Sequence, residues 1–227
     1  MSPMSKKIMQ QVLTYNVLKA KQREIKDAFP DDFGLRIHRA LSWLQRAEKE
    51  VDDCDAAFIF YWVAFNAAYA EYKIEEMTGE RSVFAEYFEK MVTLDTDHVI
   101  YNAIWQKFSD SIRLLLDNRY VFQPFWSHHN QMPGYENWEE RFAKSKRKIQ
   151  FSLRDRDTKA ILSTLFDRLY VLRNQLVHGG ATWNSSVNRS QVRDGAMIMA
   201  FVVPLFIDLM MDNSHMPWGA PHYPVVE

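Results

Sequence analysis

Three residues near the end of one apolar segment, Arg173, Asn174 and His178, have side chains suited to phosphate chemistry. A histidine imidazole exchanges a proton near neutral pH, and an arginine guanidinium binds a phosphate through two parallel hydrogen bonds. They stand in the stretch LRNQLVHGG, where apolar spacing predicts a buried helix that Gly179 and Gly180 stop. The stretch therefore predicts a proton carrier and a phosphate-binding cation at a helix end.

Helical geometry limits how these three side chains meet. Arg173 and His178 are separated by about 140° around an ideal helix and by roughly 7–8 Å along its axis. Asn174 and His178 are four residues apart and share a face, so we expect the asparagine amide to hydrogen-bond the imidazole and set its orientation and tautomer. Arg173 must then reach the same phosphate from the side or from a second chain.

The composition predicts an all-α protein, because glycine and proline are few and alternating β-branched runs are rare. We expect helices over about 4–28, 33–52, 56–77, 82–93, 97–118, from near 139 through 178 with a pause around 151–154, and over 190–211. The segment between 119 and 138 breaks this periodicity, and we expect an aromatic loop insertion there.

The 227 residues are interpreted as one domain, with a peripheral N-terminal helix in 1–30, a helical core in 33–213 and an irregular tail in 214–227. The formal net charge of −1 gives no global attraction to nucleic acid, so any such affinity must come from a local patch.

The chain has one cysteine, Cys54, which excludes an intramolecular disulfide and a Cys-cluster zinc site. Its first residues lack the apolar run of a signal peptide, and the most apolar run, 196–211, is too short for a membrane span. We expect a cytoplasmic protein with no membrane segment, no metal and no cofactor.

The stretch 172–180 resembles the Arg-x4-His motif of HEPN-domain proteins, many of which are ribonucleases. The segments 36–44 (RIHRALSWL) and 58–70 (FIFYWVAFNAAYA) resemble earlier helices of Apea-like HEPN proteins, and the final helix from about Asn188 fits too. The resemblance implies a HEPN-like helical bundle, here with an extra N-terminal helix and the aromatic insertion. It also implies a homodimer whose paired motifs form one composite active site about a twofold axis.

The chemistry implied by this resemblance is metal-independent RNA cleavage, in which the 2′-hydroxyl attacks the adjacent phosphorus and leaves a 2′,3′-cyclic phosphate and a 5′-hydroxyl. His178 would carry the proton, Arg173 would stabilise charge on the phosphoryl oxygens, and Asn174 would orient. The resemblance further implies a toxin or antiviral defence setting, in which an antitoxin or regulatory protein could restrain the activity.

Two other interpretations stay open. The chain could be a non-catalytic HEPN module that binds RNA, a nucleotide or a partner protein through the same cleft. It could also be a helical scaffold in which Arg173 pairs with a core acid and His178 caps carbonyl groups at the helix end.

The densest positive region lies in 144–159, and we predict RNA contacts from Lys146, Arg147 and Lys148 there. A solvated helix face explains the same pattern. Arg189 and Arg193 flank the predicted start of the last helix and are further candidates for phosphate contact.

Several other positions bear polar groups that need an explanation. His128 and His129 could hold a metal or stack on a base, but no carboxylate or cysteine lies at a zinc spacing, so we favour a loop that packs its aromatic rings on the bundle. Asn66 interrupts an apolar run and is expected to support the motif helix or play a structural role. Arg36, His38 and Arg39 could border the cleft, but an exposed helix start explains all three.

Overall fold

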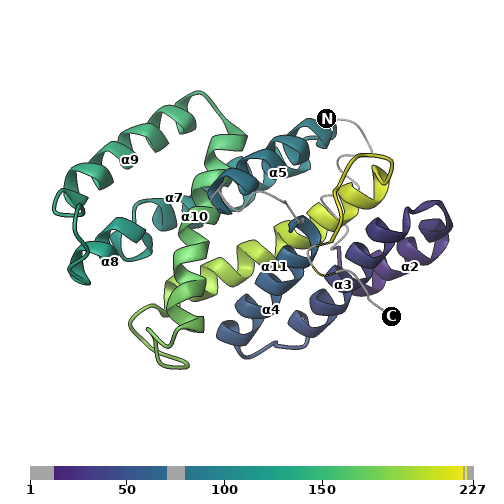
Figure 1. Ribbon diagram of the computed structural model, residues 1–227, viewed down its shortest axis with the longest axis horizontal. Coiled ribbons are helices and arrows are strands. Elements are labelled where there is room, and N and C mark those ends of the chain that lie inside the picture. The colour runs from purple at the N-terminus through teal and green to yellow at the C-terminus, as the bar shows by residue number, and fades with distance from the viewer. Residues whose placement is uncertain (1–12, 71–79, 222, 224–227) are drawn as a thin grey trace.

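The computed structural model describes residues 13–70, 80–221 and 223, and within these ranges the chain is all-α, with ten α-helices and no strand. The α-helices are α2 (Tyr15–Ile25), α3 (Asp31–Ala47), α4 (Cys54–Tyr69), α5 (Glu80–Leu94), α6 (Val99–Asn102), α7 (Ser109–Leu116), α8 (Gln123–His129), α9 (Trp138–Arg154), α10 (Thr158–Val177) and α11 (Arg189–Asp212) (Figure 1). Short helical stretches η1 (Lys26–Ala28), η2 (Ala103–Lys107) and η3 (Arg119–Val121) join some of them.

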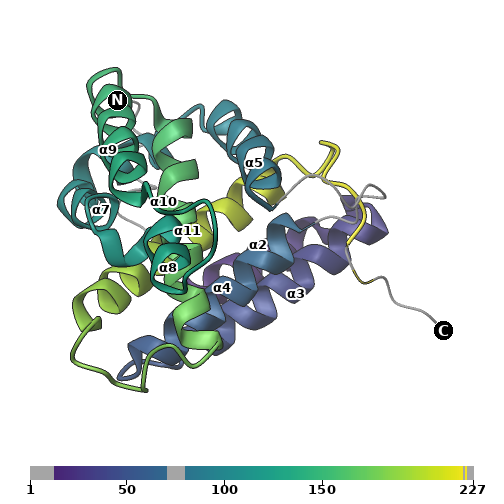
Figure 2. The same ribbon diagram turned by 60° about the vertical axis from the view of Figure 1, so that its left-hand side comes forward.

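The core is built on α4, which lies beside α3 and α11 (Figures 1 and 2). Its sequence is apolar almost all round, which is the pattern of a helix covered on every side. Aromatic rings fill the centre: Phe65 packs on Phe166 with ring centroids 4.6 Å apart, and Trp62 meets Phe84 edge to face. The predicted central helix is therefore confirmed, although it ends at Tyr69, and 71–79 lie outside the described residues.

The absence of a side chain at Gly195 lets α11 approach α4 and α10 closely. A β-carbon at this position would lie 3.1 Å from Cε2 of Phe58 and 3.2 Å from a Cδ2 atom of both Leu169 and Leu172. Such distances are shorter than ordinary carbon contacts, so a larger residue would push the three helices apart. Glycine at this position thus fixes the spacing of α4, α10 and α11.

Helix α11 is the last helix that we predicted, and it runs slightly further, from Arg189 to Asp212. By length and composition alone it could cross a membrane, but 72% of its most apolar window is buried inside the bundle. The core helix of a soluble protein passes the same test, so this is weak evidence for a membrane span.

The N-terminal helix packs on the bundle through α2. Leu18 is fully buried, and the Lys21 ammonium lies 2.6 Å from an Asp208 carboxylate oxygen and 2.7 Å from one of Asp212. This helix begins at Tyr15, after the non-helical Leu13 and Thr14, and the predicted start near Met4 lies outside the described residues.

The helix predicted over 97–118 is interrupted twice. Asp95 accepts hydrogen bonds from the backbone N–H groups of Val99, Ile100 and Tyr101, so the first turn starts two residues late. Burial raises the pKa of the Asp95 carboxyl, and these three N–H groups oppose that shift. The π-helical stretch η2 then ends at Lys107, and α7 begins at Ser109, after Phe108. The apolar stripe predicted along this segment is nevertheless buried at Ile100, Ile104, Ile112 and Leu115.

Within the predicted aromatic loop, η3 and α8 are helical while 130–137 form turns, so the prediction is wrong over 119–121 and 123–129. Pro124 stands in the first turn of α8, where its missing N–H costs nothing. Phe122, Phe125 and Trp138 form a small apolar cluster of their own, and the His129 ring lies 4.1 Å from that of Phe125. The insertion therefore packs its aromatic rings mainly on one another. The expected pause at 151–154 also falls later, at 155–157.

Arg36 is buried, with 1% of its surface exposed, so its interpretation as part of an exposed helix start is wrong. Its guanidinium donates to the carbonyl oxygens of Ala68 (2.8 Å), Ala70 (2.7 Å), Gly219 (3.2 Å) and Ala220 (3.1 Å). One cation thus joins the end of α4 to the C-terminal segment, which Trp218 also holds by donating to the Asn213 carbonyl.

We expect Arg36→Met to lower the free energy of unfolding by about 3 kcal/mol, because buried carbonyl oxygens lose their donors. For a chain of this size that corresponds to a fall in melting temperature of roughly 6–12 °C. Differential scanning calorimetry measures this fall in melting temperature. Arg39→Met is the matched control, because Arg39 donates to the Tyr223 carbonyl at an exposed position and should change little. Equal melting temperatures for the two variants would contradict the role given to Arg36.

Candidate functional site

The motif residues lie at the C-terminal end of α10, which ends at Val177 as the two glycines predicted. His178 is the C-cap, and Gly179 follows with a left-handed φ of 70°. The N–H of Gly179 donates to the Leu176 carbonyl at 3.3 Å, and the N–H of Ala181 donates to that of Gln175 at 3.1 Å. Glycine is favoured here because other residues are strained at this φ.

His178 is exposed, and its imidazole makes no hydrogen bond with any residue that the structure describes. Its backbone N–H donates to the Asn174 carbonyl at 3.0 Å, which continues the helical pattern to the last residue. The backbone of His178 is therefore held by the helix while its side chain is exposed and can meet a ligand.

Arg173 and Asn174 are both half-buried, and their side chains are joined to each other. The Arg173 Nη1 donates to the Asn174 Oδ1 at 2.8 Å. The predicted bond from the asparagine amide to the His178 imidazole is not formed between these described residues, because the amide oxygen faces the guanidinium instead. Asn174 thus orients the arginine of the motif.

Two aromatic rings complete the surroundings of Arg173. Its guanidinium carbon lies 5.3 Å from the ring centroid of Tyr170 and 5.8 Å from that of Trp62. The ring faces attract the cation and restrict its movement. Tyr170 is three residues before Arg173, a spacing from which the contact could have been predicted. Trp62 comes from α4, and only the packing of two distant segments brings it here.

The loop after the motif is fixed to the first turn of α4 by two aspartates that the sequence did not single out. Asp53 caps α4 by accepting from Asp55 and Ala56 N–H groups, and it also accepts from the Trp183 Nε1 at 2.9 Å. The hydrogen bond from Ala56 is the main cause that lowers the pKa of Asp53. Asp55 accepts from the Asn184 N–H at 2.7 Å.

Arg189 belongs to the same anchor, since its guanidinium lies 2.8 Å from the buried carboxylate of Asp55. This ion pair holds the start of α11 and argues against the predicted phosphate contact, which stays a prediction. Arg193 is more exposed, and its guanidinium lies 3.4 Å from a carboxylate oxygen of the neighbouring Asp194.

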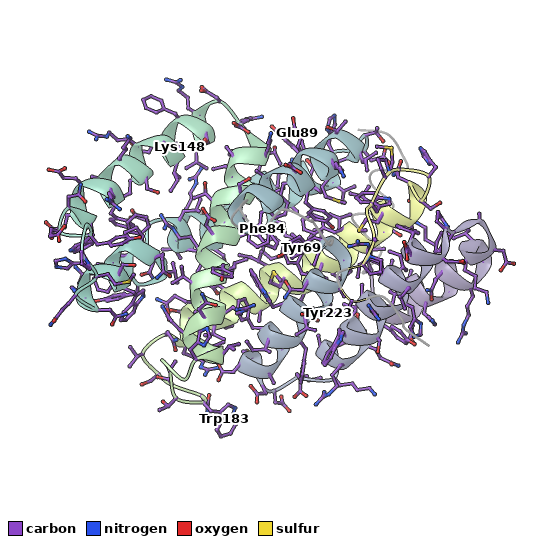
Figure 3. The ribbon with its side chains drawn as sticks, in the orientation of Figure 1. Tyr69, Phe84, Glu89, Lys148, Trp183 and Tyr223 are labelled. Atoms are coloured by element: carbon purple, nitrogen blue, oxygen red, sulfur yellow. The ribbon has the colours of Figure 1, made fainter. Side chains whose placement is uncertain are left out.

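The three predicted RNA-binding residues of α9 are divided between two sides of that helix. Lys146 forms an ion pair with Asp117, which belongs to the segment after α7. Arg147 and Lys148 are exposed and line a groove between α9 and α10. Lys148 and Trp183 lie near opposite ends of α10 in Figure 3, so these cations are distant from the motif.

Asn66 does not take the supporting role considered for it. Its Oδ1 is buried without a hydrogen-bond partner among the described residues, and none of its side-chain bonds there reaches α10. It borders a cavity of about 430 Å³ together with Arg39 and Trp43.

A possible metal site was also considered for His128 and His129. Within the described ranges, no group of three or more His, Cys, Asp or Glu side chains is placed to hold a metal ion. The two histidines instead contact the aromatic cluster of the insertion, with the His128 ring 6.3 Å from that of Trp138.

Comparison of the chain with protein-family models, with curated proteins and with solved structures gives no match. The function of the site is therefore argued from its own residues.

We expect Gly179→Ala to lower the free energy of unfolding by about 1 kcal/mol, because alanine is strained at a φ of 70°. The melting temperature should fall by roughly 2–4 °C. Gly34→Ala is the control: this glycine is inside α3, and its added β-carbon would lie at an ordinary 3.9 Å from the Phe29 side chain, so alanine should raise the melting temperature there. If Gly179→Ala melts like the unchanged chain, the left-handed cap does not stabilise the helix end.

Proposed function

We propose that this protein is an endoribonuclease that cleaves RNA by attack of the 2′-hydroxyl on the adjacent phosphorus. The observation that carries the proposal is the arrangement at the end of α10. The imidazole of His178 is exposed at the helix end, five residues after Arg173, whose guanidinium Asn174 orients and two aromatic rings contact. The resemblance of this stretch to the HEPN motif supports the same activity.

The two side chains match the two requirements of this reaction. The 2′-oxygen forms a bond to phosphorus and loses its proton, while the bond from phosphorus to the 5′-oxygen breaks and that oxygen gains a proton. His178 serves as the proton carrier at one of these oxygens, a role worth about 10²–10⁴ in rate. Arg173 stabilises the negative charge that grows on the phosphoryl oxygens.

A homodimer with a composite site is part of this proposal. Three apolar side chains around the motif are well exposed in one chain: Val177 (55%), Trp183 (75%) and Val187 (90%). These side chains come from the end of α10 and the loop that follows it, and exposed apolar groups are typical of a surface that another protein covers. A second copy at this end of the bundle would bring a second Arg173 and His178 to one phosphate. We place the protein in the cytoplasm, in a toxin or antiviral defence setting, with an antitoxin or regulatory protein as its restraint.

A non-catalytic module that binds RNA, a nucleotide or a partner protein is the second candidate. The helical geometry favours this candidate, because Arg173 and His178 are about 140° apart around α10. One chain alone therefore does not direct both side chains to the same phosphate.

Arg173→Ala/His178→Ala should abolish cleavage of mixed RNAs measured in EDTA, with a loss of at least about 10²-fold. The products of the unchanged chain should end in a 2′,3′-cyclic phosphate and a 5′-hydroxyl. Arg23→Ala/His215→Ala is the matched control, because both residues are exposed and lie outside the motif. Cleavage that survives in the motif variant would remove these residues from the site. RNA binding without cleavage by the unchanged chain would support the second candidate.

Val177→Asp/Val187→Asp should dissociate the dimer and reduce cleavage, because two charges would be buried between the copies. The mass in solution is measured by analytical ultracentrifugation. Leu114→Asp/Met132→Asp makes the same change at exposed positions of α7 and of the turn after α8 and should leave the dimer intact. A monomeric mass for the unchanged chain at every concentration would contradict the composite site.

A further inference from the structure

A groove between α9 and α10 gathers positive charge far from the motif. Its volume is about 890 Å³, and its cationic lining comes from α9: Arg141, Lys144, Arg147 and Lys148. Arg141, Lys144 and Lys148 repeat at three and four residues, so they follow one side of that helix. The groove is therefore an elongated positive surface on a chain whose formal net charge is −1.

The charges in this groove are exposed rather than bound by acids. Lys144, Arg147 and Lys148 form no ion pair with any residue that the structure describes. By contrast, Lys146 on the same helix is paired with Asp117, and Arg154 is paired with Asp155 at 2.7 Å. Asp167 is the acidic residue of the lining, and it already interacts within the protein.

Aromatic side chains accompany the cations. Phe151 lies in the last turn of α9, where 56% of its surface is exposed, and Phe122 lines the groove from the insertion. Beneath them, the buried Arg168 contacts the Phe122 ring at 4.5 Å and donates to the Ser145 Oγ at 3.0 Å. These contacts attach α9 and the insertion to α10, so the groove is built on packed elements.

The groove is aligned with the motif along α10. Asp167 in its lining, Asn174 and His178 lie within about 40° of one another around an ideal helix. The rise from Asp167 to His178 is about 16 Å. The insertion also contacts α10 near the motif, since the Gln175 Nε2 donates to the Tyr120 carbonyl at 2.6 Å. The Tyr120 side chain there is 48% exposed.

We propose that the α9–α10 groove binds single-stranded RNA and directs the strand along α10 toward His178. The binding of the strand is independent of the endoribonuclease proposal, and only its destination rests on that function. Unpaired lysine and arginine side chains attract the phosphates without regard to sequence. The exposed Phe151 ring can stack on a base, and unstacked bases are available only in single strands.

The binding test uses a labelled 2′-O-methyl oligouridine of about 15 nucleotides, which lacks the attacking hydroxyl and survives the assay. Fluorescence anisotropy gives its dissociation constant at several salt concentrations. Lys144→Gln/Arg147→Gln/Lys148→Gln should weaken binding at least tenfold and reduce the slope of log affinity against log salt by about 2. Phe151→Ala should weaken binding about tenfold with little change in that slope.

The matched control is Arg23→Gln/Lys26→Gln/Lys49→Gln, which removes the same charge from exposed positions on α2, η1 and the segment after α3. It should bind like the unchanged chain. If both triple variants weaken RNA binding equally, or if neither weakens it, the proposed role of the groove is overturned. A polyglutamate peptide that binds as tightly as the oligonucleotide through the same lysines would also overturn it, because that result indicates an acidic protein partner.

Cleavage assays separate this proposal from the endoribonuclease proposal. Groove-dependent binding by a chain that does not cleave RNA would support the groove and contradict the proposed function. Cleavage at an unchanged rate by the groove variant, with unchanged binding, would overturn the groove and leave the motif assignment standing.

Discussion

The close approach of three helices at Gly195 is the constraint on which the rest of the structure depends. Because no side chain separates α11 from Phe58, Leu169 and Leu172, the first turns of α4 and α11 and the last turn of α10 gather at one end of the bundle. The anchoring of the loop after the motif follows from this arrangement, since Asp55 can reach Arg189 only when α4 and α11 start side by side. The motif is thus positioned by the core packing as well as by its own helix.

The distribution of cations is a second consequence of this packing. A nearly neutral chain uses some arginines for structure, as Arg36 joins carbonyl groups from two segments and Arg189 pairs with a buried aspartate. Other cations stand in the groove without acidic partners among the described residues, and Lys144 and Lys148 are examples. The net charge therefore says little about this protein's surface. A chain with nearly zero net charge can still hold some cations in ion pairs and leave others exposed.

The helical class, the central helix and the end of α10 could be predicted from the sequence, because apolar periodicity and paired glycines are local signals. The burial of Arg36 could not, since its partners are backbone carbonyls that lie from 32 to 184 residues further along the chain. Trp62 beside Arg173 was missed for the same reason. The insertion was mistaken for a loop because its short helices are stabilised by a separate aromatic cluster, which leaves no long periodic pattern. The hydrogen-bond partner of Asn174 could not be predicted from the sequence either, because its side chain could bond to either Arg173 or His178.

The rigidity of α10 has a geometric consequence for any strand that lies along it. The helix is twenty residues long and is packed on both α5 and α9, so its two ends keep a fixed separation and a fixed rotation. Each residue contributes about 1.5 Å and 100°. Inserting or deleting one residue between Asp167 and Asn174 would turn His178 by about 100° relative to the groove. The same change would move Leu169 or Leu172 out of the buried face of α10. The core packing of α10 therefore also fixes the rotation of His178 relative to the groove.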